Sequence, residues 1–340
     1  MEIGVFSFGD VLPHPVTGDV PSHADKMRDL VRLGKLADEV GLDVFAVGEH
    51  HRLDMVVSSP AVVLAAIAQA TSQIKLSSAT TLLNTLDPVR VFEDFATLDL
   101  LSNGRAELIL GRGSFTESWE LFGLDRKDYD ARFAEHLDLI MKLNESERVT
   151  WDGHFRPALK EAEISPRPTR PLPFWVGVGG TPGSAYRAGQ LGLAMNMAIL
   201  GQPAGFRDLV AVWEKGAQDA GRERPQLAAS SHGLLMDDAD AAKEAFMAHW
   251  GTIMRKGLRN RFPPRDIPRE YLELEAGPSG AFFAGDAETI IAKARWQRDL
   301  FGLDRLLLNV DWGGVPFEDA ARSIEILGRE VAPALRDTTS

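Results

Sequence analysis

The chain has 340 residues, of which 44% are hydrophobic and 25% are charged, values typical of a globular protein with a large core. It carries 37 Lys and Arg against 49 Asp and Glu, and the net charge of −12 disfavours nucleic acid and anionic membranes as partners. The absence of cysteine excludes disulfides, thiolate zinc sites, cysteine-ligated iron–sulfur clusters and a cysteine nucleophile.

The first residues predict a strand in a cytoplasmic protein. An acid, Glu2, stands where a signal peptide needs basic residues, and the apolar run that follows is too short for a signal sequence. Residues 55–74 carry no charge, but Ser, Pro, Thr and Gln interrupt their apolar run. We therefore expect a buried helix in this stretch and no membrane span.

Short apolar runs alternate with longer helical patterns along almost the whole chain, as in repeated βαβ units. Caps followed by proline predict helix starts at Ser59, Asp87 and Thr181. Glycines such as Gly41 and Gly302 predict helix ends. Eight strands are predicted, over residues 3–8, 43–47, 75–83, 105–110, 174–178, 194–199, 227–235 and 305–310.

Eight such units favour an α/β fold closed as a TIM (β/α)8 barrel, in a single domain over residues 1–340. An open doubly wound sheet is the alternative. Two connections are too long for simple barrel loops and predict insertions after strands 4 and 7. Residues 111–172 contain a predicted helix over 130–143, and residues 236–304 contain two predicted helices.

The second strand runs into Gly48-Glu-His-His-Arg52, at the end of the barrel where active sites lie. Neighbouring side chains of an extended chain point to opposite sides, so we expect only one of His50 and His51 to face the barrel mouth. A metal clamp made by both is therefore disfavoured. The other interpretation is an ordinary polar loop whose histidines are satisfied locally.

The fourth strand ends in Gly111-Arg-Gly113, and an arginine between glycines is suited to binding a phosphate. The fifth strand leads into a glycine-rich turn ending in Ser184, which presents backbone N–H groups and hydroxyls to an anion. No acid follows where a dinucleotide site needs one, so a mononucleotide phosphate fits better than NAD. Since these strands are neighbours in a barrel, we expect both features to converge. The alternatives are an arginine that is solvent-exposed or paired with a neighbouring acid such as Glu117, and a turn that binds nothing.

Six basic residues form a cluster in this otherwise acidic chain. It predicts either a solvated helix face paired with Glu270, Glu273 and Glu275, or a lid over the pocket that attracts anions. The cluster consists of Arg255, Lys256, Arg259, Arg261, Arg265 and Arg269.

In order along the chain, these motifs resemble the bacterial luciferase-like superfamily of flavin-dependent monooxygenases, over essentially the entire length. The resemblance rests on Glu49-His-His51, Asp87-Pro-Val-Arg90, Leu98-Asp-Leu-Leu-Ser-Asn-Gly-Arg105, Gly111-Arg-Gly113 and Val178-Gly-Gly-Thr-Pro-Gly-Ser184. It implies a TIM barrel with insertions that binds reduced FMN.

The resemblance also implies roles for individual residues. The catalytic histidine falls on His50, and a non-proline cis peptide beneath the flavin falls on Ala79–Thr80. Four residues are implied to contact the flavin phosphate, namely Arg112, Gly180, Thr181 and Ser184. No metal is implied.

The resemblance implies that reduced flavin reacts with O2 to give a C4a-peroxide, which an apolar pocket protects before it oxygenates a small organic substrate. His50 is expected to hydrogen-bond or relay protons beside it. Because the chain shows no NAD(P) fingerprint, a separate flavin reductase is expected to deliver reduced FMN. The helix over residues 60–70 is apolar on nearly every face, which predicts a homodimer through the second and third helices.

Three other functions remain open. An oxidoreductase of the same superfamily that uses coenzyme F420 requires basic groups for that cofactor's polyanionic tail, which the basic cluster offers. A flavin-binding protein without catalysis is the second. The third is a metal-dependent barrel hydrolase, which the scattered positions of the eight histidines disfavour.

Overall fold

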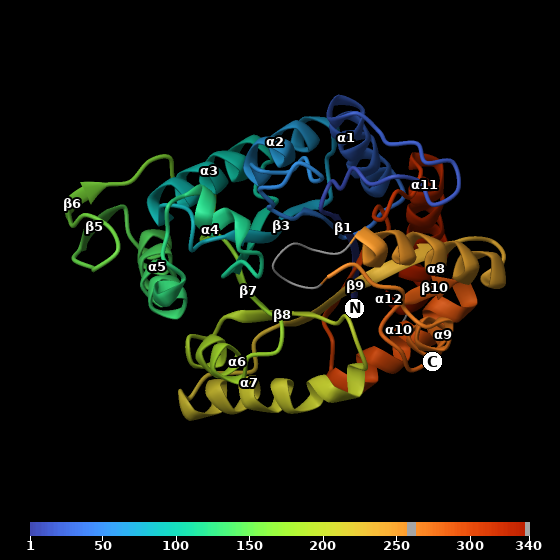
Figure 1. The fold of residues 1–340 in the computed structure, drawn as a ribbon. Coiled ribbons are helices and arrows are strands. Elements are labelled where there is room, and N and C mark those ends of the chain that lie inside the picture. Colours follow the sequence, from blue (N-terminus) through green and yellow to red (C-terminus); the bar gives the residue numbers. More distant parts are fainter. Residues whose placement is uncertain (257–262, 337–340) are drawn as a thin grey trace.

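Eight parallel strands close into a barrel in the computed structural model, which describes residues 1–256 and 263–336 (Figure 1). β9 pairs with β8 and with β11, and β11 pairs with β1, so the sheet is continuous. The closed TIM barrel is confirmed, and each predicted strand bound lies within one residue of the observed bound. The barrel strands are β1 (Glu2–Ser7), β2 (Val44–Val47), β3 (Lys75–Leu82), β4 (Ala106–Gly111), β7 (Phe174–Val178), β8 (Ala194–Ala198), β9 (Leu227–Leu235) and β11 (Arg305–Asn309).

In the described part of the chain, eight helices surround the barrel and pack on one another around it (Figure 1). They are α1 (His23–Glu39), α2 (Pro60–Ala70), α3 (Pro88–Leu101), α5 (Tyr129–Glu145), α6 (Pro182–Gln190), α7 (Arg207–Asp219), α10 (Ala287–Phe301) and α11 (Phe317–Ile326). The π-helical turn η3 (Leu327–Val331) and α12 (Ala332–Arg336) continue α11. No helix in the described ranges is both long and apolar enough to cross a membrane.

The insertions lie where the sequence predicts them, but the second contains more structure than expected. After β4 come α4 (Glu117–Leu121), η1 (Arg126–Asp128), α5 and the antiparallel hairpin of β5 (Arg148–Trp151) and β6 (Leu159–Glu163), which projects at the left of Figure 1. After β9 come α8 (Ala239–Lys256), α9 (Arg269–Ala276), β10 (Phe283–Gly285) and α10. The expectation of two helices in residues 236–304 is wrong, because three are present and β10 adds a parallel strand beside β9. The short η2 (Pro203–Phe206) precedes α7.

Local capping explains several of these boundaries. The side chain of Asp87 accepts a hydrogen bond from the backbone N–H of Val89 at 2.8 Å and begins α3 as predicted. Gly302 ends α10 in the left-handed conformation, with φ of 67°, which a residue with a Cβ rarely adopts. Ser59 precedes α2, but its side chain makes no capping hydrogen bond, so the start of that helix depends on Pro60 and on packing.

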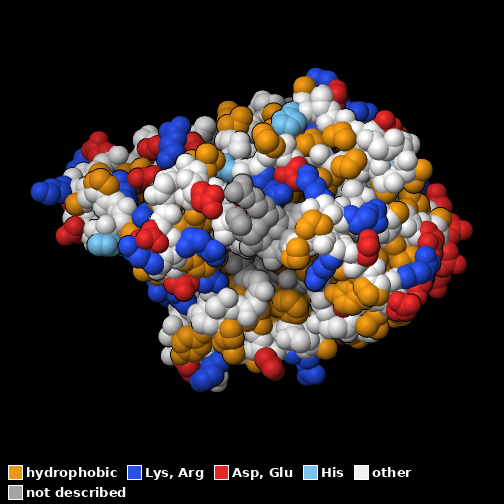
Figure 2. All heavy atoms as spheres, viewed as in Figure 1, with side chains coloured by type: hydrophobic (Ala, Val, Ile, Leu, Met, Phe, Trp, Pro, Cys, Tyr) orange, Lys and Arg blue, Asp and Glu red, His pale blue; other side chains and the backbone are white. Residues whose placement is uncertain are grey.

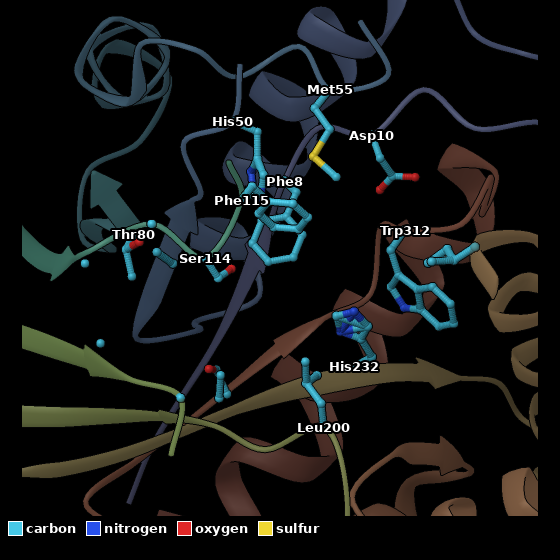
Figure 3. A pocket seen from close by; sticks show the side chains of 18 of the residues that line it. Phe8, Asp10, His50, Met55, Thr80, Ser114, Phe115, Leu200, His232 and Trp312 are labelled. Atoms are coloured by element: carbon cyan, nitrogen blue, oxygen red, sulfur yellow. The ribbon is translucent and has the colours of Figure 1, made fainter. Parts of the chain in front are cut away.

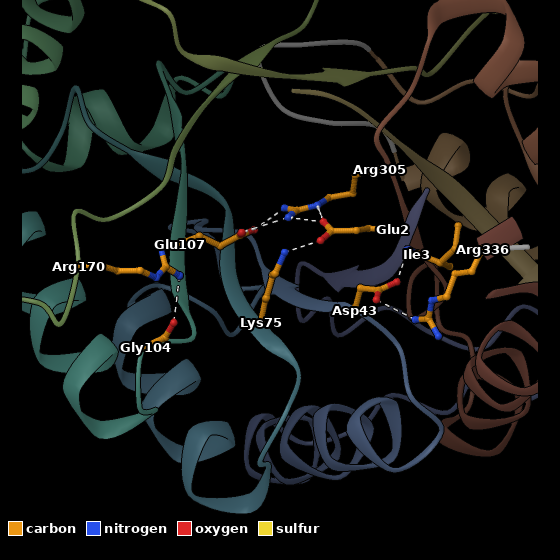
Figure 4. Close-up of polar contacts among 9 residues, drawn as sticks. All are labelled: Glu2, Ile3, Asp43, Lys75, Gly104, Glu107, Arg170, Arg305 and Arg336. Carbon is orange, nitrogen blue, oxygen red and sulfur yellow. Dashed lines mark hydrogen bonds and ion pairs between the residues drawn. The ribbon is translucent and has the colours of Figure 1, made fainter. Parts of the chain in front are cut away.

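A charged cluster fills the amino-terminal end of the barrel (Figure 4). Arg305, at the start of β11, is 1% exposed and binds the carboxylates of Glu107 and Glu2. Its guanidinium carbon lies 4.3 Å from the ring centroid of Trp175, and Lys75 pairs with Glu2 at the same end. Because these residues and the apolar side chains above them occupy the interior, the space for a ligand lies at the opposite end.

Candidate active site

A cavity of about 900 Å³ lies at the carboxyl ends of the barrel strands, a volume within the range of small-molecule sites. Its lining comes from residues at or just beyond the ends of all eight barrel strands, together with α8 and α9. Figure 3 shows the cavity from close by, with His50, Phe8 and Phe115 facing His232 and Trp312 across it. In the space-filling view, charged side chains of both signs surround the centre of this face (Figure 2).

Glu49 fixes the loop that follows β2. One oxygen of its buried carboxylate accepts a hydrogen bond from the backbone N–H of Leu82 at 2.9 Å, and the other lies 2.8 Å from Nε2 of His51. Its own backbone N–H donates to the carbonyl of Thr80 at 3.0 Å. Glu49 therefore joins the ends of β2 and β3 and orients His51.

His50 is a buried neutral base in the cavity wall. Its ring packs edge-on against Phe8 at 4.7 Å and against Phe115 at 5.1 Å between centroids. Burial lowers the pKa of His50 to about 4, so the imidazole is uncharged at neutral pH. Its Nδ1 is buried and has no hydrogen-bond partner within the described residues. The resemblance places the catalytic residue here, and this nitrogen is free to bind a ligand.

The expectation that only one of the two histidines faces the barrel mouth is wrong. Both His50 and His51 line the cavity. β2 ends at Val47, so the two histidines lie in a loop, where side chains no longer alternate as they do in a strand. His51 is engaged by Glu49 and packs on the ring of Phe122, whereas His50 keeps a free nitrogen.

Ala79 and Thr80 form part of the cavity wall on β3, and the peptide bond between them is cis, as the resemblance implies. Glycines on neighbouring strands give this bond room. A Cβ on Gly111 would lie 2.5 Å from Oγ1 of Thr80, and one on Gly177 would lie 2.8 Å from its Cγ2. A larger residue at either glycine is therefore incompatible with this position of Thr80.

Arg112 and Thr181 converge at the rim, as their strand positions predict. An Nη of Arg112 donates to Oγ1 of Thr181 at 3.1 Å, and the other lies 2.6 Å from Oδ1 of Asp130. The arginine is therefore paired with an acid, as the alternative interpretation predicts, but the acid is Asp130, and Glu117 pairs with Arg52 instead. The guanidinium also lies 5.0 Å from the ring centroid of Tyr129. The guanidinium and the hydroxyl are both groups that donate hydrogen bonds to anions, and they lie at one end of the cavity.

The other two predicted phosphate ligands lie beside the cavity instead of lining it. Gly180 is exposed with φ of 131°, and Ser184 is half-buried in the first turn of α6. The backbone N–H of Ser184 already donates to the carbonyl of Thr181 at 3.1 Å. Thr181 itself makes no side-chain capping bond, which leaves its hydroxyl to Arg112.

The basic cluster is divided between two environments. Lys256 and Arg265 line the cavity, and Lys256 lies 2.7 Å from a carboxylate oxygen of Asp54. Arg269 instead forms surface ion pairs with Glu244 and Glu273, as the solvated-face interpretation predicts. Two further members, Arg259 and Arg261, lie outside the described residues.

Several residues that line the cavity are not indicated by any of the sequence motifs described above. His232 on β9 is 7% exposed, and burial lowers its pKa to about 3. Asn196 on β8 donates to the hydroxyl of Ser230 at 3.1 Å, and its buried Oδ1 is unpartnered in the described structure. The polar run Ser230-Ser-His232 inside an otherwise apolar strand is the signal that reveals them. Asp10, Trp250 and Trp312 complete this part of the wall.

No group of three or more His, Cys, Asp or Glu side chains in the described ranges is arranged to hold a metal ion. Of the eight histidines, only His50, His51 and His232 are among the residues that line the cavity. His51 is held by Glu49, and the neutral rings of His50 and His232 are packed among aromatic side chains.

Comparison with known proteins agrees with this geometry. A family model described as luciferase-like monooxygenase matches residues 1–295. The 4-hydroxyprotoasukamycin monooxygenase of Streptomyces nodosus subsp. asukaensis is 29% identical over 348 residues, which cover 96% of this chain and 91% of the relative. The similarity therefore extends over nearly the whole of both proteins.

Solved structures share the fold at low sequence identity. The monooxygenase RslO1 from Streptomyces bottropensis has a TM-score of 0.85 at 22% identity, over 98% of this chain and 100% of that one. The oxygenating constituent of 3,6-diketocamphane monooxygenase from Pseudomonas putida, in complex with FMN, has a TM-score of 0.78 at 20% identity, over 98% of each chain. An F420-dependent secondary alcohol dehydrogenase has a TM-score of 0.75 at 21% identity, over 99% of each chain. Together with the family match over residues 1–295, the barrel and its cavity identify this chain as a member of the luciferase-like monooxygenase family.

Proposed function

We propose that this chain is a monooxygenase that uses reduced FMN and O2 to oxygenate a small organic substrate. The observation that carries the proposal is one cavity that combines an anion site at its rim with a buried, uncharged histidine in its wall. The anion site is formed by Arg112 and Thr181, where an Nη of the arginine lies 3.1 Å from Oγ1 of the threonine. The histidine is His50. Family membership supports the reaction class.

The residues present fit FMN. Arg112 and Thr181 match a single phosphate group, because a guanidinium and a hydroxyl both donate to phosphate oxygens. The small side chains of Ala79 and Thr80, and the absence of a Cβ at Gly111 and Gly177, leave a wall suited to a flat ring. Nδ1 of His50 has no hydrogen-bond partner among the described residues, and a bound ligand could supply one.

When bound, reduced flavin supplies the electrons that activate O2. Arg112 and Thr181 would hold its phosphate, in competition with Asp130, which already lies 2.6 Å from one Nη of the guanidinium. Phe8 and Phe115 cover the ring of His50 and exclude water from it. His50, neutral at the pH of the cell, donates or accepts one proton at Nδ1 beside the reacting atoms.

A second candidate is an oxidoreductase of the same family that uses F420. The observation that favours it is the position of Lys256 and Arg265 in the lining of the same cavity, where basic groups suit a polyanionic tail. Lys256 is already paired with Asp54, just as Arg112 is paired with Asp130, so a polyanionic tail that uses Lys256 would have to displace a further carboxylate.

Titration of the purified chain with FMN, riboflavin, FAD and F420 tests the choice of cofactor. We expect FMN to bind most tightly, because riboflavin lacks the phosphate that Arg112 holds and the tail of F420 must displace Asp54 from Lys256. Tight binding of F420 with weak binding of FMN contradicts the FMN proposal and supports the second candidate.

Stopped-flow mixing of reduced FMN with O2 tests catalysis. The chain should change the rate at which oxidised flavin absorbance returns, relative to free FMN. An unchanged rate with bound FMN indicates a flavin-binding protein without catalysis. We also propose that a separate flavin reductase supplies reduced FMN. NADPH alone should therefore not reduce the bound flavin, and an added reductase should restore the reaction.

A further inference from the structure

One end of the cavity is walled by aromatic side chains. We call the group His232, Trp250 and Trp312 the aromatic end. The ring centroid of His232 lies 5.1 Å from that of Trp250 and 5.1 Å from that of Trp312. The ring centroids of the two tryptophans lie 5.3 Å apart. Figure 3 shows His232 and Trp312 on the opposite side of the cavity from Thr80 and Ser114. This end is therefore separate from the strand that faces the proposed flavin ring.

The aromatic end contains a single buried imidazole with an unused nitrogen. Nδ1 of His232 is buried and has no partner in the described part of the chain. Aromatic rings surround it, so burial alone keeps it neutral. An unpaired buried polar atom costs free energy, and a ligand that hydrogen-bonds to it recovers that cost. A hydroxyl or carbonyl group placed among apolar rings meets this need.

The charges around the cavity disfavour an anionic ligand at this end. Asp10 lines it, buried, with one carboxylate oxygen accepting a hydrogen bond from the N–H of Gly313 at 2.8 Å. Arg52 at the mouth is bound by Asp54 and by Glu117, each at 2.8 Å. A carboxylate or phosphate brought to His232 therefore meets a neutral ring with the carboxylate of Asp10 in the same wall, and Lys256 in the lining is paired with Asp54.

We propose that the aromatic end binds the substrate, and that this substrate is an uncharged aromatic or conjugated molecule with a hydroxyl or carbonyl group that hydrogen-bonds to His232. Tryptophan rings pack favourably on the faces and edges of such a molecule. The identification of the ligand as the oxygenated substrate rests on the proposed function, whereas the binding selectivity does not.

Calorimetric titration at about pH 8 tests the selectivity with three matched probes, namely a naphthol, the corresponding methylnaphthalene and the corresponding naphthoate. We expect the naphthol to bind about 3- to 10-fold more tightly than the methylnaphthalene, which is the range of one neutral hydrogen bond. The naphthoate should bind most weakly. In the variant His232→Phe the naphthol should lose its advantage, while the methylnaphthalene keeps its affinity.

Control variants keep this test informative. His154→Phe changes an exposed histidine outside the cavity and should alter none of the three affinities. If His232→Phe fails to fold, as judged by circular dichroism, His232→Gln retains a polar group and should keep the preference for the naphthol. Trp312→Leu should weaken all three probes.

Tightest binding of the naphthoate, or a preference for the naphthol that survives His232→Phe, overturns the inference. The titrations are run on the chain alone and on the FMN-saturated chain, and FMN should not displace the probes. Competition between FMN and the naphthol contradicts the separate location of the aromatic end. Because probe binding needs no flavin, failure of the FMN titration disproves the proposed function without affecting the measured selectivity.

Discussion

Replacing Arg112 by alanine removes both the guanidinium that holds Thr181 and the partner of Asp130. The side chain of Arg112 is 16% exposed, so a phosphate bound to it is partly shielded from water. A hydrogen bond to a charged group in such a setting contributes about 1.5–3 kcal/mol. That range corresponds to a loss of FMN affinity of roughly ten- to a hundredfold.

The ion pair with Asp130 refines this magnitude. FMN must compete with a carboxylate that already lies 2.6 Å from the guanidinium, so we expect the lower part of the range, about tenfold. Asp130 is 82% exposed, and its attraction is weakened by solvent. Asp130→Asn should therefore change affinity in the opposite direction and tighten FMN binding by about 2- to 5-fold.

Quenching of flavin fluorescence measures both variants, with riboflavin as the matched ligand that lacks the phosphate. Riboflavin affinity should be the same in wild type, Arg112→Ala and Asp130→Asn. Equal weakening of FMN and riboflavin by Arg112→Ala refutes the phosphate assignment, because it shows that the arginine acts on the ring or on the fold.

Three further predictions concern catalysis, stability and assembly. His50→Ala should bind FMN within a few-fold of wild type but release hydrogen peroxide in place of oxygenated product. An oxygen electrode and a peroxide assay measure this outcome. If His51→Ala gives this result and His50→Ala stays active, the assignment of His50 is wrong. Burial raises the pKa of Asp10 from 3.8 to about 6, so the folded state binds the extra proton and this group's contribution to the free energy of unfolding falls as pH rises from about 4 through 6. The variant Asp10→Asn should lack this fall. If the difference in the free energy of unfolding between wild type and variant, measured by urea denaturation, stays constant across that pH range, the prediction is wrong. We also propose a homodimer through α2 and α3, which the 68% exposure of the apolar Val62 on α2 supports. Light scattering should show that Val62→Glu converts the dimer to a monomer. A wild-type protein that is monomeric at micromolar concentration contradicts the proposal.

The features that the sequence predicts correctly are those set by neighbouring residues. The cap at Asp87, the left-handed Gly302 and the apolar strand runs each depend on a few consecutive positions. The sequence does not predict the hairpin of β5 and β6, because β5 is only four residues long and two consecutive exposed residues, Lys160 and Glu161, interrupt the alternation in β6. Local patterns thus predict the barrel strands, the places of the insertions and the helix α5, but not the hairpin that follows α5.

The site was predictable only where a motif lies at a strand end. Arg112 and Thr181 meet because neighbouring parallel strands end at the same rim. The roles of His50 and His51 depend instead on a carboxylate and on the loop beyond β2, which alternation does not describe. His232 acquires its surroundings from Trp250 and Trp312, which are distant in sequence, so its character emerges only in three dimensions.

The contact between Arg305 and Glu107 links β11 to β4, strands that are not neighbours in the sheet, and so braces the barrel across its width. Without β11, a half barrel of β1 to β4 would present Glu2 and Glu107 toward its interior without their arginine. The amino-terminal half is therefore a poor candidate for an independent folding unit. Splitting this chain between β4 and β7 should yield fragments that become stable only on reassembly, because Glu107 and Arg305 then lie on different fragments.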